Sequence, residues 1–69
     1  MTDLWLYGTG GHAQEIRELV KAFNHHGGTY RILGWIDDDP SRIGTRLKGL
    51  PVYDLVTAFK LCPEAQVTV

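Results

Sequence analysis

Apolar and polar residues form blocks along the chain, and the period of each block predicts an element of secondary structure. Asp3 to Tyr7 is apolar on both faces of an extended chain, which is typical of a strand buried in a parallel sheet. From His12 to about His26, apolar residues recur at spacings of three and four, which predicts an amphipathic helix. Gly27-Gly28 follows where this periodicity stops, as expected just beyond a helix end.

The second half of the chain predicts the same kinds of element in shorter form. The expected bounds are Tyr30–Ile36 for a strand, 41–49 for an irregular surface segment, 50–53 for a short extended segment, 55–61 for a helix and 66–69 for a last strand. Asp54 is placed to cap the second helix, and Pro63 ends it. The alternation predicts an α/β fold: a truncated Rossmann-like parallel sheet with crossover helices, in the order strand-helix-strand-helix-strand. Trp5 and Trp35 fall within strands and are expected in the core.

Length and charge narrow the possible functions. The 69 residues suffice for one small domain, and a net charge of −1 offers no electrostatic footprint for nucleic acid or an anionic membrane. Apolar runs stay well short of the ~20 residues of a membrane span. A single cysteine, Cys62, favours a reducing cytoplasmic location. Because the chain stops within a predicted strand, we expect residues 1–69 to be the front of a longer protein.

The glycine-rich turn after the first strand is the main candidate site. Gly8, Gly10 and Ala13 match the G-x-G-x-x-G/A pattern that places phosphate on backbone N–H groups at a helix N-terminus. Gly11 removes a further side chain from the phosphate side, and His12 stands on the first helical turn, within reach of a phosphate or a sugar. The alternatives are a purely structural turn and a histidine that caps the helix or faces solvent.

Acidic residues follow the second strand. In nicotinamide enzymes an acidic residue at this place binds the ribose hydroxyls. Asp37 occupies it, 24 residues after Ala13, and Asp38 is the second candidate for ligand contact. A carboxylate here repels a 2′-phosphate and so disfavours NADP. Three consecutive acidic residues cannot all point at one ion without a special loop, so we expect no metal site at residues 37–39. The alternative is a solvated acidic turn.

The order of these motifs resembles the N-terminal domain of bacterial sugar O-/N-acyltransferases of the sialic acid O-acetyltransferase type. This PglD-like family includes UDP-bacillosamine N-acetyltransferase. The matching motifs are Gly8-x-Gly10-Gly11-His12-Ala13 after a strand, then Leu33-Gly34-Trp35-Ile36-Asp37-Asp38-Asp39-Pro40, then Gly44, and then Gly49-Leu50-Pro51-Val52. The similarity runs over nearly the whole chain, and the combination is more specific than a glycine turn alone.

The resemblance implies a two-part enzyme. Its Rossmann-like domain binds the UDP-sugar acceptor, and a β-helix of hexapeptide repeats binds acetyl-CoA, carries the histidine base and assembles as a homotrimer. By resemblance, the substrate-binding residues here are Gly8, Gly10, Gly11, His12, Asp37 and Asp38. Hexapeptide repeats are absent from these 69 residues, so we expect the chain to bind the acceptor, to hold no cofactor and to catalyse nothing. Thr9 stands where the family often has a small apolar residue, and its side chain is expected to point away from the phosphates and to be tolerated.

Two other functions stay open at this point. One is the NAD-binding domain of a dehydrogenase or of a sugar-nucleotide epimerase or dehydratase, against which Gly11-His12 and the run Asp37 to Pro40 argue. The other is a non-enzymatic Rossmann-like module that binds a ligand or promotes oligomerisation. The sequence does not say which sugar is carried or whether the acceptor atom is nitrogen or oxygen.

Overall fold

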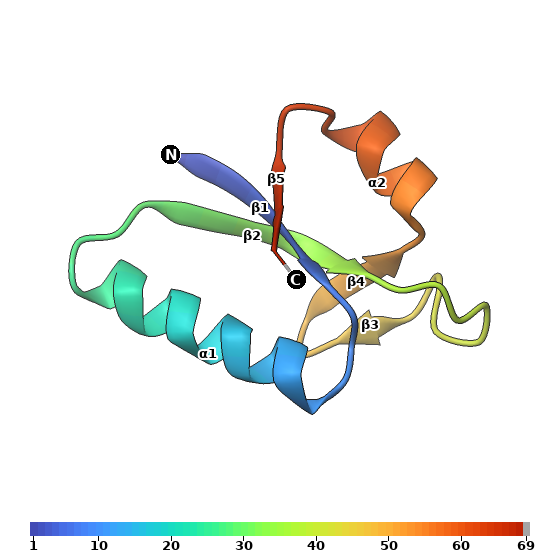
Figure 1. Ribbon diagram of the computed structural model, residues 1–69, viewed down its shortest axis with the longest axis horizontal. Helices are drawn as coiled ribbons and strands as arrows, with labels where there is room; N and C mark the ends of the chain where they lie inside the picture. The colour runs from blue at the N-terminus through green and yellow to red at the C-terminus, as the bar shows by residue number, and fades with distance from the viewer. Residues whose placement is uncertain (69) are drawn as a thin grey trace.

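A sheet with one helix against each face forms the protein, for which the computed structural model describes residues 1–68 (Figure 1). Within these residues the elements are β1 (Thr2–Tyr7), α1 (Gly11–His25), β2 (Tyr30–Ile36), β3 (Arg46–Leu47), β4 (Leu50–Tyr53), α2 (Leu55–Leu61) and β5 (Gln66–Thr68). The first strand, both helices and the second strand agree with the predicted elements to within a residue at each end. The last predicted strand is confirmed over residues 66–68, and Val69 lies outside the described residues.

The strands lie in the order β3-β4-β2-β1-β5. β1 pairs in parallel with both β2 and β5, and β2 pairs in parallel with β4. The chain therefore builds outward from β1 on one side and then crosses to the other side for β5. The predicted Rossmann-like parallel sheet is confirmed for these four strands. Its strand order reverses at β1, which is where ligands bind in open α/β sheets.

The prediction of an irregular segment over residues 41–49 is wrong at its end. Arg46 and Leu47 form β3, which pairs antiparallel with β4 in a hairpin. Lys48 and Gly49 connect the two strands with φ angles of 50° and 78°, and positive φ at both central residues is what a type I′ hairpin turn requires. The indole Nε1 of Trp35 donates a hydrogen bond of 2.9 Å to the carbonyl of Leu47, so the hairpin is tied to β2. The sheet is consequently mixed and has five strands in residues 1–68.

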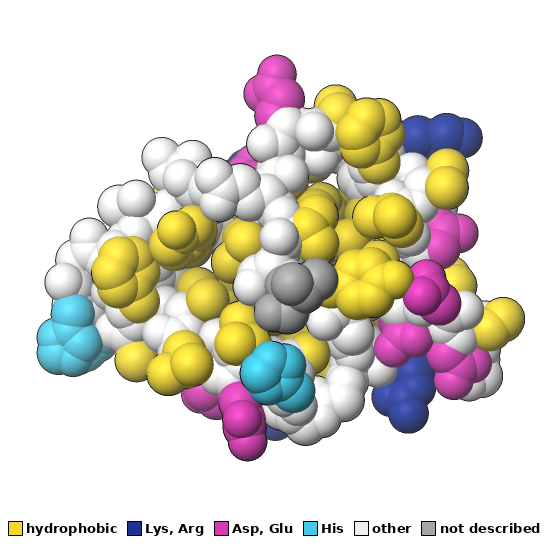
Figure 2. All heavy atoms as spheres, in the orientation of Figure 1, with side chains coloured by type: hydrophobic (Ala, Val, Ile, Leu, Met, Phe, Trp, Pro, Cys, Tyr) yellow, Lys and Arg dark blue, Asp and Glu magenta, His cyan; other side chains and the backbone are white. Residues whose placement is uncertain are grey.

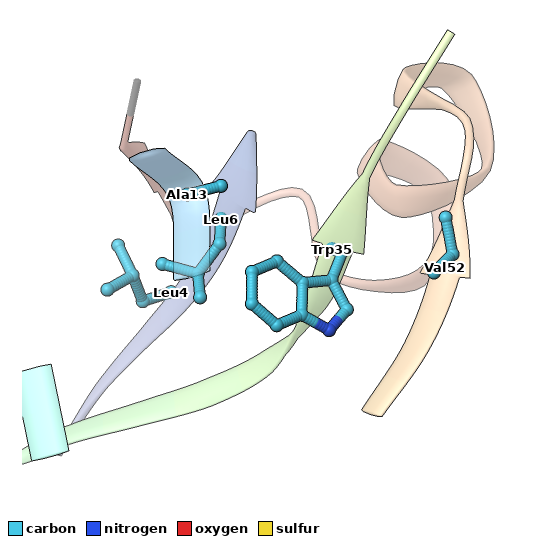
Figure 3. Close-up of a cluster of buried hydrophobic side chains, with 5 residues drawn as sticks. All are labelled: Leu4, Leu6, Ala13, Trp35 and Val52. Atoms are coloured by element: carbon cyan, nitrogen blue, oxygen red, sulfur yellow. The ribbon is translucent and has the colours of Figure 1, made fainter. Parts of the chain in front are cut away.

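Alternate residues of β1 and β2 face opposite helices. Leu4 and Leu6 of β1 pack with Trp35 of β2 and Val52 of β4, and Ala13 of α1 joins them on this face (Figure 3). With five buried residues against three on the opposite face, this cluster is the larger part of the core described in residues 1–68.

The opposite face carries a second, smaller cluster. Trp5, Ile36 and Ala58 of α2 form it, and the ring of Tyr53 meets that of Trp5 edge-on at 5.8 Å between centroids. Trp5 and Trp35 are therefore both core residues, as predicted. The indole N–H of Trp5 is buried and has no hydrogen-bond partner among residues 1–68.

Local chemistry explains where the helices end. Gly28 donates its N–H to Phe23 O at 2.9 Å, and Gly27 adopts φ = 100°, so the pair closes α1 as the sequence predicts. Asp54 caps α2, since its Oδ1 accepts the N–H of Thr57 at 2.7 Å, which confirms the predicted cap.

Both helices also expose apolar side chains to solvent. Figure 2 shows apolar groups gathered on the face of the molecule that is turned to the viewer in Figure 1. The exposed large apolar residues are Met1, Leu19 and Phe23, Leu55, Val56, Phe59 and Leu61 of α2, and Val67 of β5. Neither helix described in residues 1–68 combines the length and the apolarity needed to cross a membrane.

Candidate functional site

The glycine turn and the acidic segment meet because β1 and β2 are neighbours that end together. Tyr7, the last residue of β1, lies opposite Ile36, the last residue of β2. The N–H of Gly8 then donates to the carbonyl of Ile36 at 2.6 Å. The structure therefore brings the turn that follows β1 next to Asp37.

The backbone of the turn is bare on its outer side. Gly8 adopts φ = 94°, a conformation that side chains strongly disfavour. Gly10 is the N-cap of α1, with φ = −78° and ψ = −173°, and no side chain of the described residues caps the helix there. A Cβ atom built on Gly10 or Gly11 would meet nothing within 4 Å. Space is therefore open directly beside the backbone at these two glycines.

Backbone donors line this open space. Gln14 is the first residue whose N–H bonds back to the turn, to the carbonyl of Gly10 at 3.1 Å. The N–H groups of Gly11, His12 and Ala13 come before it and have no partner among residues 1–68. They sit at the positive end of the α1 dipole, where an anion is favoured. His12 is exposed on the same helical turn.

Thr9 is the one buried polar residue of the turn, with 5% of its surface exposed. Its hydroxyl donates to Asp37 Oδ2 at 2.5 Å and accepts from Arg42 Nη1 at 2.9 Å. Its carbonyl accepts from Gln14 Nε2 at 3.0 Å. The Thr9 side chain thus points into the protein, where two charged side chains hold its hydroxyl.

The carboxylate of Asp37 is used within the chain. Besides the Thr9 bond, its Oδ1 accepts the N–H of Asp39 at 2.9 Å. These two bonds, the Thr9 bond first, hold the pKa of Asp37 below its ordinary value, because each favours the charged form. Asp39 continues the pattern by accepting both the N–H and the hydroxyl of Ser41, at 3.0 and 2.8 Å. The loop after β2 is therefore braced by its own carboxylates.

Asp38 differs from Asp37 in being exposed at the edge of the site. Its Oδ2 accepts a hydrogen bond of 2.8 Å from the hydroxyl of Tyr7, and this bond raises the pKa of that phenol. Of the two predicted acidic residues, Asp37 mainly holds the turn and Asp38 faces outward. Tyr7 is a neighbour of the site that the sequence analysis did not single out.

A small cavity of about 90 Å³ lies on the inner side of the turn. It is lined by Thr9, Arg42, Thr45, Arg46, Leu47 and Val52. The guanidinium of Arg46 is hydrogen-bonded within the chain, since its Nη2 donates to the carbonyl of Gly49 at 2.6 Å. In residues 1–68 no group of three histidine, cysteine or carboxylate side chains is placed to hold a metal ion.

Comparison with known proteins identifies the family to which the chain belongs. No curated protein and no solved structure matches the chain. The family model described as PglD N-terminal domain matches residues 3–69. Since the match covers all but the first two of the 69 residues, the chain belongs to this family, the N-terminal domain of PglD-like acetyltransferases.

Proposed function

We propose that this chain binds a UDP-sugar through the glycine turn and serves as the acceptor-binding domain of an acetyl-CoA-dependent sugar O- or N-acetyltransferase. Membership of the PglD N-terminal domain family supports the acetyltransferase context. The observation that best supports binding is the run of free N–H groups at Gly11, His12 and Ala13 beside open space at Gly10. Such donors at a helix N-terminus suit a diphosphate.

In this proposal the diphosphate oxygens accept hydrogen bonds from the first turn of α1. The absence of a side chain at Gly10 and Gly11 lets the phosphates approach the backbone closely. His12 donates to a phosphate or to the sugar from the same helical turn. Asp38, the exposed carboxylate, faces the ribose or the base, while Asp37 holds the turn in place.

Catalysis is assigned to no residue of this chain. The proposed enzyme needs a base to deprotonate the acceptor amine or hydroxyl, which then attacks the thioester carbon of acetyl-CoA. We propose that the base, the acetyl-CoA site and homotrimer formation lie outside residues 1–69, and that the enzyme works in the cytoplasm. The chain on its own is then a binding domain.

Calorimetry with UDP and NAD⁺ tests the choice of ligand. A dinucleotide enzyme uses the acidic residue after β2 to bind both ribose hydroxyls. Here each Asp37 oxygen already accepts one hydrogen bond from the chain, which favours UDP. We expect UDP to bind and NAD⁺ to bind more weakly. Tighter binding of NAD⁺ would assign the chain to the dehydrogenase or epimerase type, and binding of neither would leave the non-enzymatic module.

Replacing Gly10 by valine tests the path of the phosphates. A Cβ atom at Gly10 would meet no atom of residues 1–68 within 4 Å, and the φ angle of −78° suits an L-residue, so the fold should tolerate the change. We expect UDP affinity to fall at least ~10-fold, which corresponds to about 1.4 kcal/mol of binding free energy. The reason is that the isopropyl group fills the space proposed for the diphosphate. Gly10→Ala, with a smaller group, should lose less. UDP affinity unchanged in Gly10→Val would place the ligand elsewhere.

A further inference from the structure

The glycine turn has almost no side chains with which to hold its own shape. Three of the four residues from Gly8 to Gly11 are glycines, and glycine loses the most conformational freedom when it is ordered. Free N–H groups bind a diphosphate tightly when the protein already holds them in the binding geometry. If they have to be ordered on binding, the entropy cost lowers the affinity. Thr9 is the only residue of the four with a side chain.

Contacts from two segments, the loop after β2 and the helix α1, converge on Thr9. The hydroxyl lies between the carboxylate of Asp37, which follows β2, and the guanidinium of Arg42, in the turn of residues 40–44. The side chain of Gln14, from α1, donates to the Thr9 carbonyl. Hydrogen bonds to charged groups are stronger than those between neutral groups, so the first two contacts hold best.

The loop that presents Asp37 and Arg42 is itself braced. The N–H of Arg42 donates to Asp39 O at 2.9 Å, and Arg42 Nε lies 3.6 Å from Asp39 Oδ2. The hydroxyl of Thr45 donates to the carbonyl of Arg42 at 2.5 Å. With Asp37 accepting the N–H of Asp39 as well, the loop forms a fixed support for the Thr9 hydroxyl.

We propose that Thr9 is a positioning residue, through which Asp37 and Arg42 hold the glycine turn with its free N–H groups aimed at the diphosphate. This proposal rests on the proposed function for the identity of the ligand, although its claim about the turn does not need one. Thr9 touches no ligand in this arrangement, because its side chain is buried on the inner side of the turn. Its effect on binding is therefore exerted through the backbone on either side of it.

Two substitutions at Thr9 separate the hydroxyl from the volume of the side chain. Thr9→Val keeps the shape but loses both hydrogen bonds, whereas Thr9→Ser keeps the hydroxyl. We expect Thr9→Val to weaken UDP about 10-fold by calorimetry and uridine less than about twofold, since preorganised donors act on the diphosphate alone. Thr9→Ser should restore most of the UDP affinity.

Asp54→Ala is the matched control for general destabilisation. It removes a carboxylate that, like Asp37, holds a backbone N–H, but it does so at the start of α2, away from the turn. We expect it to lower the melting temperature and to leave UDP affinity unchanged. If Thr9→Val weakens UDP and uridine equally, or no more than Asp54→Ala does, Thr9 has only a general role in stability and the proposal is wrong.

Order parameters from ¹⁵N relaxation test the turn without any ligand. In the wild-type chain, Gly10 and Gly11 should be as rigid as the core, near ~0.85, and in Thr9→Val they should fall below ~0.6. A turn that stays rigid in Thr9→Val overturns the proposal. If wild-type protein binds no UDP, the proposed function fails, and this comparison still decides whether Thr9 positions the turn.

Arg42→Gln covers the case in which Thr9→Val does not fold. The side chain of Arg42 is more than half exposed, so its loss should be tolerated, while Thr9 keeps Asp37 as its only charged partner. We expect an intermediate loss of UDP affinity, about threefold, with lowered order parameters at Gly10 and little change for uridine. Unaltered order and unaltered UDP affinity in this variant contradict the proposal.

Discussion

Two tryptophan residues on opposite faces of the sheet differ in whether the indole N–H is hydrogen-bonded. Trp35 and Trp5 are both buried within the core. The Trp35 N–H bonds to the carbonyl of Leu47, whereas the Trp5 N–H has no partner among residues 1–68. A buried donor without a partner costs free energy, so we expect the two indoles to contribute differently to stability although both are buried.

Replacing each indole by phenylalanine should reveal this difference. Both substitutions leave a small cavity, but only Trp35→Phe breaks a hydrogen bond. We expect Trp35→Phe to lower the free energy of unfolding by about 1–2 kcal/mol more than Trp5→Phe does. Urea denaturation followed by circular dichroism measures both, and equal losses would mean that the Trp5 N–H finds a partner in solution.

Whether a helix or strand could be predicted from the sequence depended on the length of its hydrophobic pattern. The 15-residue helix α1 has four turns of apolar spacing and two glycines after it, so its bounds were predictable. The two-residue strand β3 is too short to show any period. Its only signal is Lys48-Gly49 between Leu47 and Leu50, which places a tight turn between apolar residues.

The candidate site was predictable to the same extent. The glycines and Asp37 could be found because each stands at the end of a strand in a known motif. The bonds of Thr9 could not, since its partners Asp37 and Arg42 lie 28 and 33 residues away in the sequence. Whether Asp37 faces a ligand or braces the turn depends on that long-range packing, and no local pattern encodes it.

The hairpin turn can be improved by substitution. Lys48 adopts φ = 50°, where asparagine is much better tolerated than lysine, and Asn-Gly is the preferred pair for a type I′ turn. We expect Lys48→Asn to raise the free energy of unfolding by about 0.5 kcal/mol. Lys60→Asn, at the end of α2, removes the same charge without this benefit and serves as the control. Denaturant titration that finds no gain for Lys48→Asn would argue against the hairpin.

Four aspartate side chains spread over the whole molecule accept hydrogen bonds in the folded state that favour their ionised form. Such bonds lower the pKa of Asp37 through Thr9, that of Asp54 through Thr57, that of Asp39 through Ser41 and that of Asp3 through Arg31. A carboxyl whose pKa is lower when folded than when unfolded adds stability at neutral pH. That stability declines as the pH drops below the unfolded value, which is 3.8 for aspartate.

Thermal unfolding across pH tests this dependence. We expect the melting temperature to change little between pH 7 and pH 5 and to decrease steeply below about pH 4, as these carboxyl groups take up protons. Asp37→Asn cannot be protonated at that position, so its melting temperature should start lower and decline less with acid. A melting temperature that does not change down to pH 3 would show that these bonds contribute nothing to stability.

The proposed function requires that a diphosphate bind to the first turn of α1. Titration of ¹⁵N-labelled protein with UDP, followed by amide chemical shifts, observes that event residue by residue. We predict the largest shifts at Gly10, Gly11, His12 and Ala13, whose N–H groups border open space or have no partner in residues 1–68, and smaller shifts at Asp38. Saturable shifts confined to other elements, or no shifts at millimolar UDP, would contradict it.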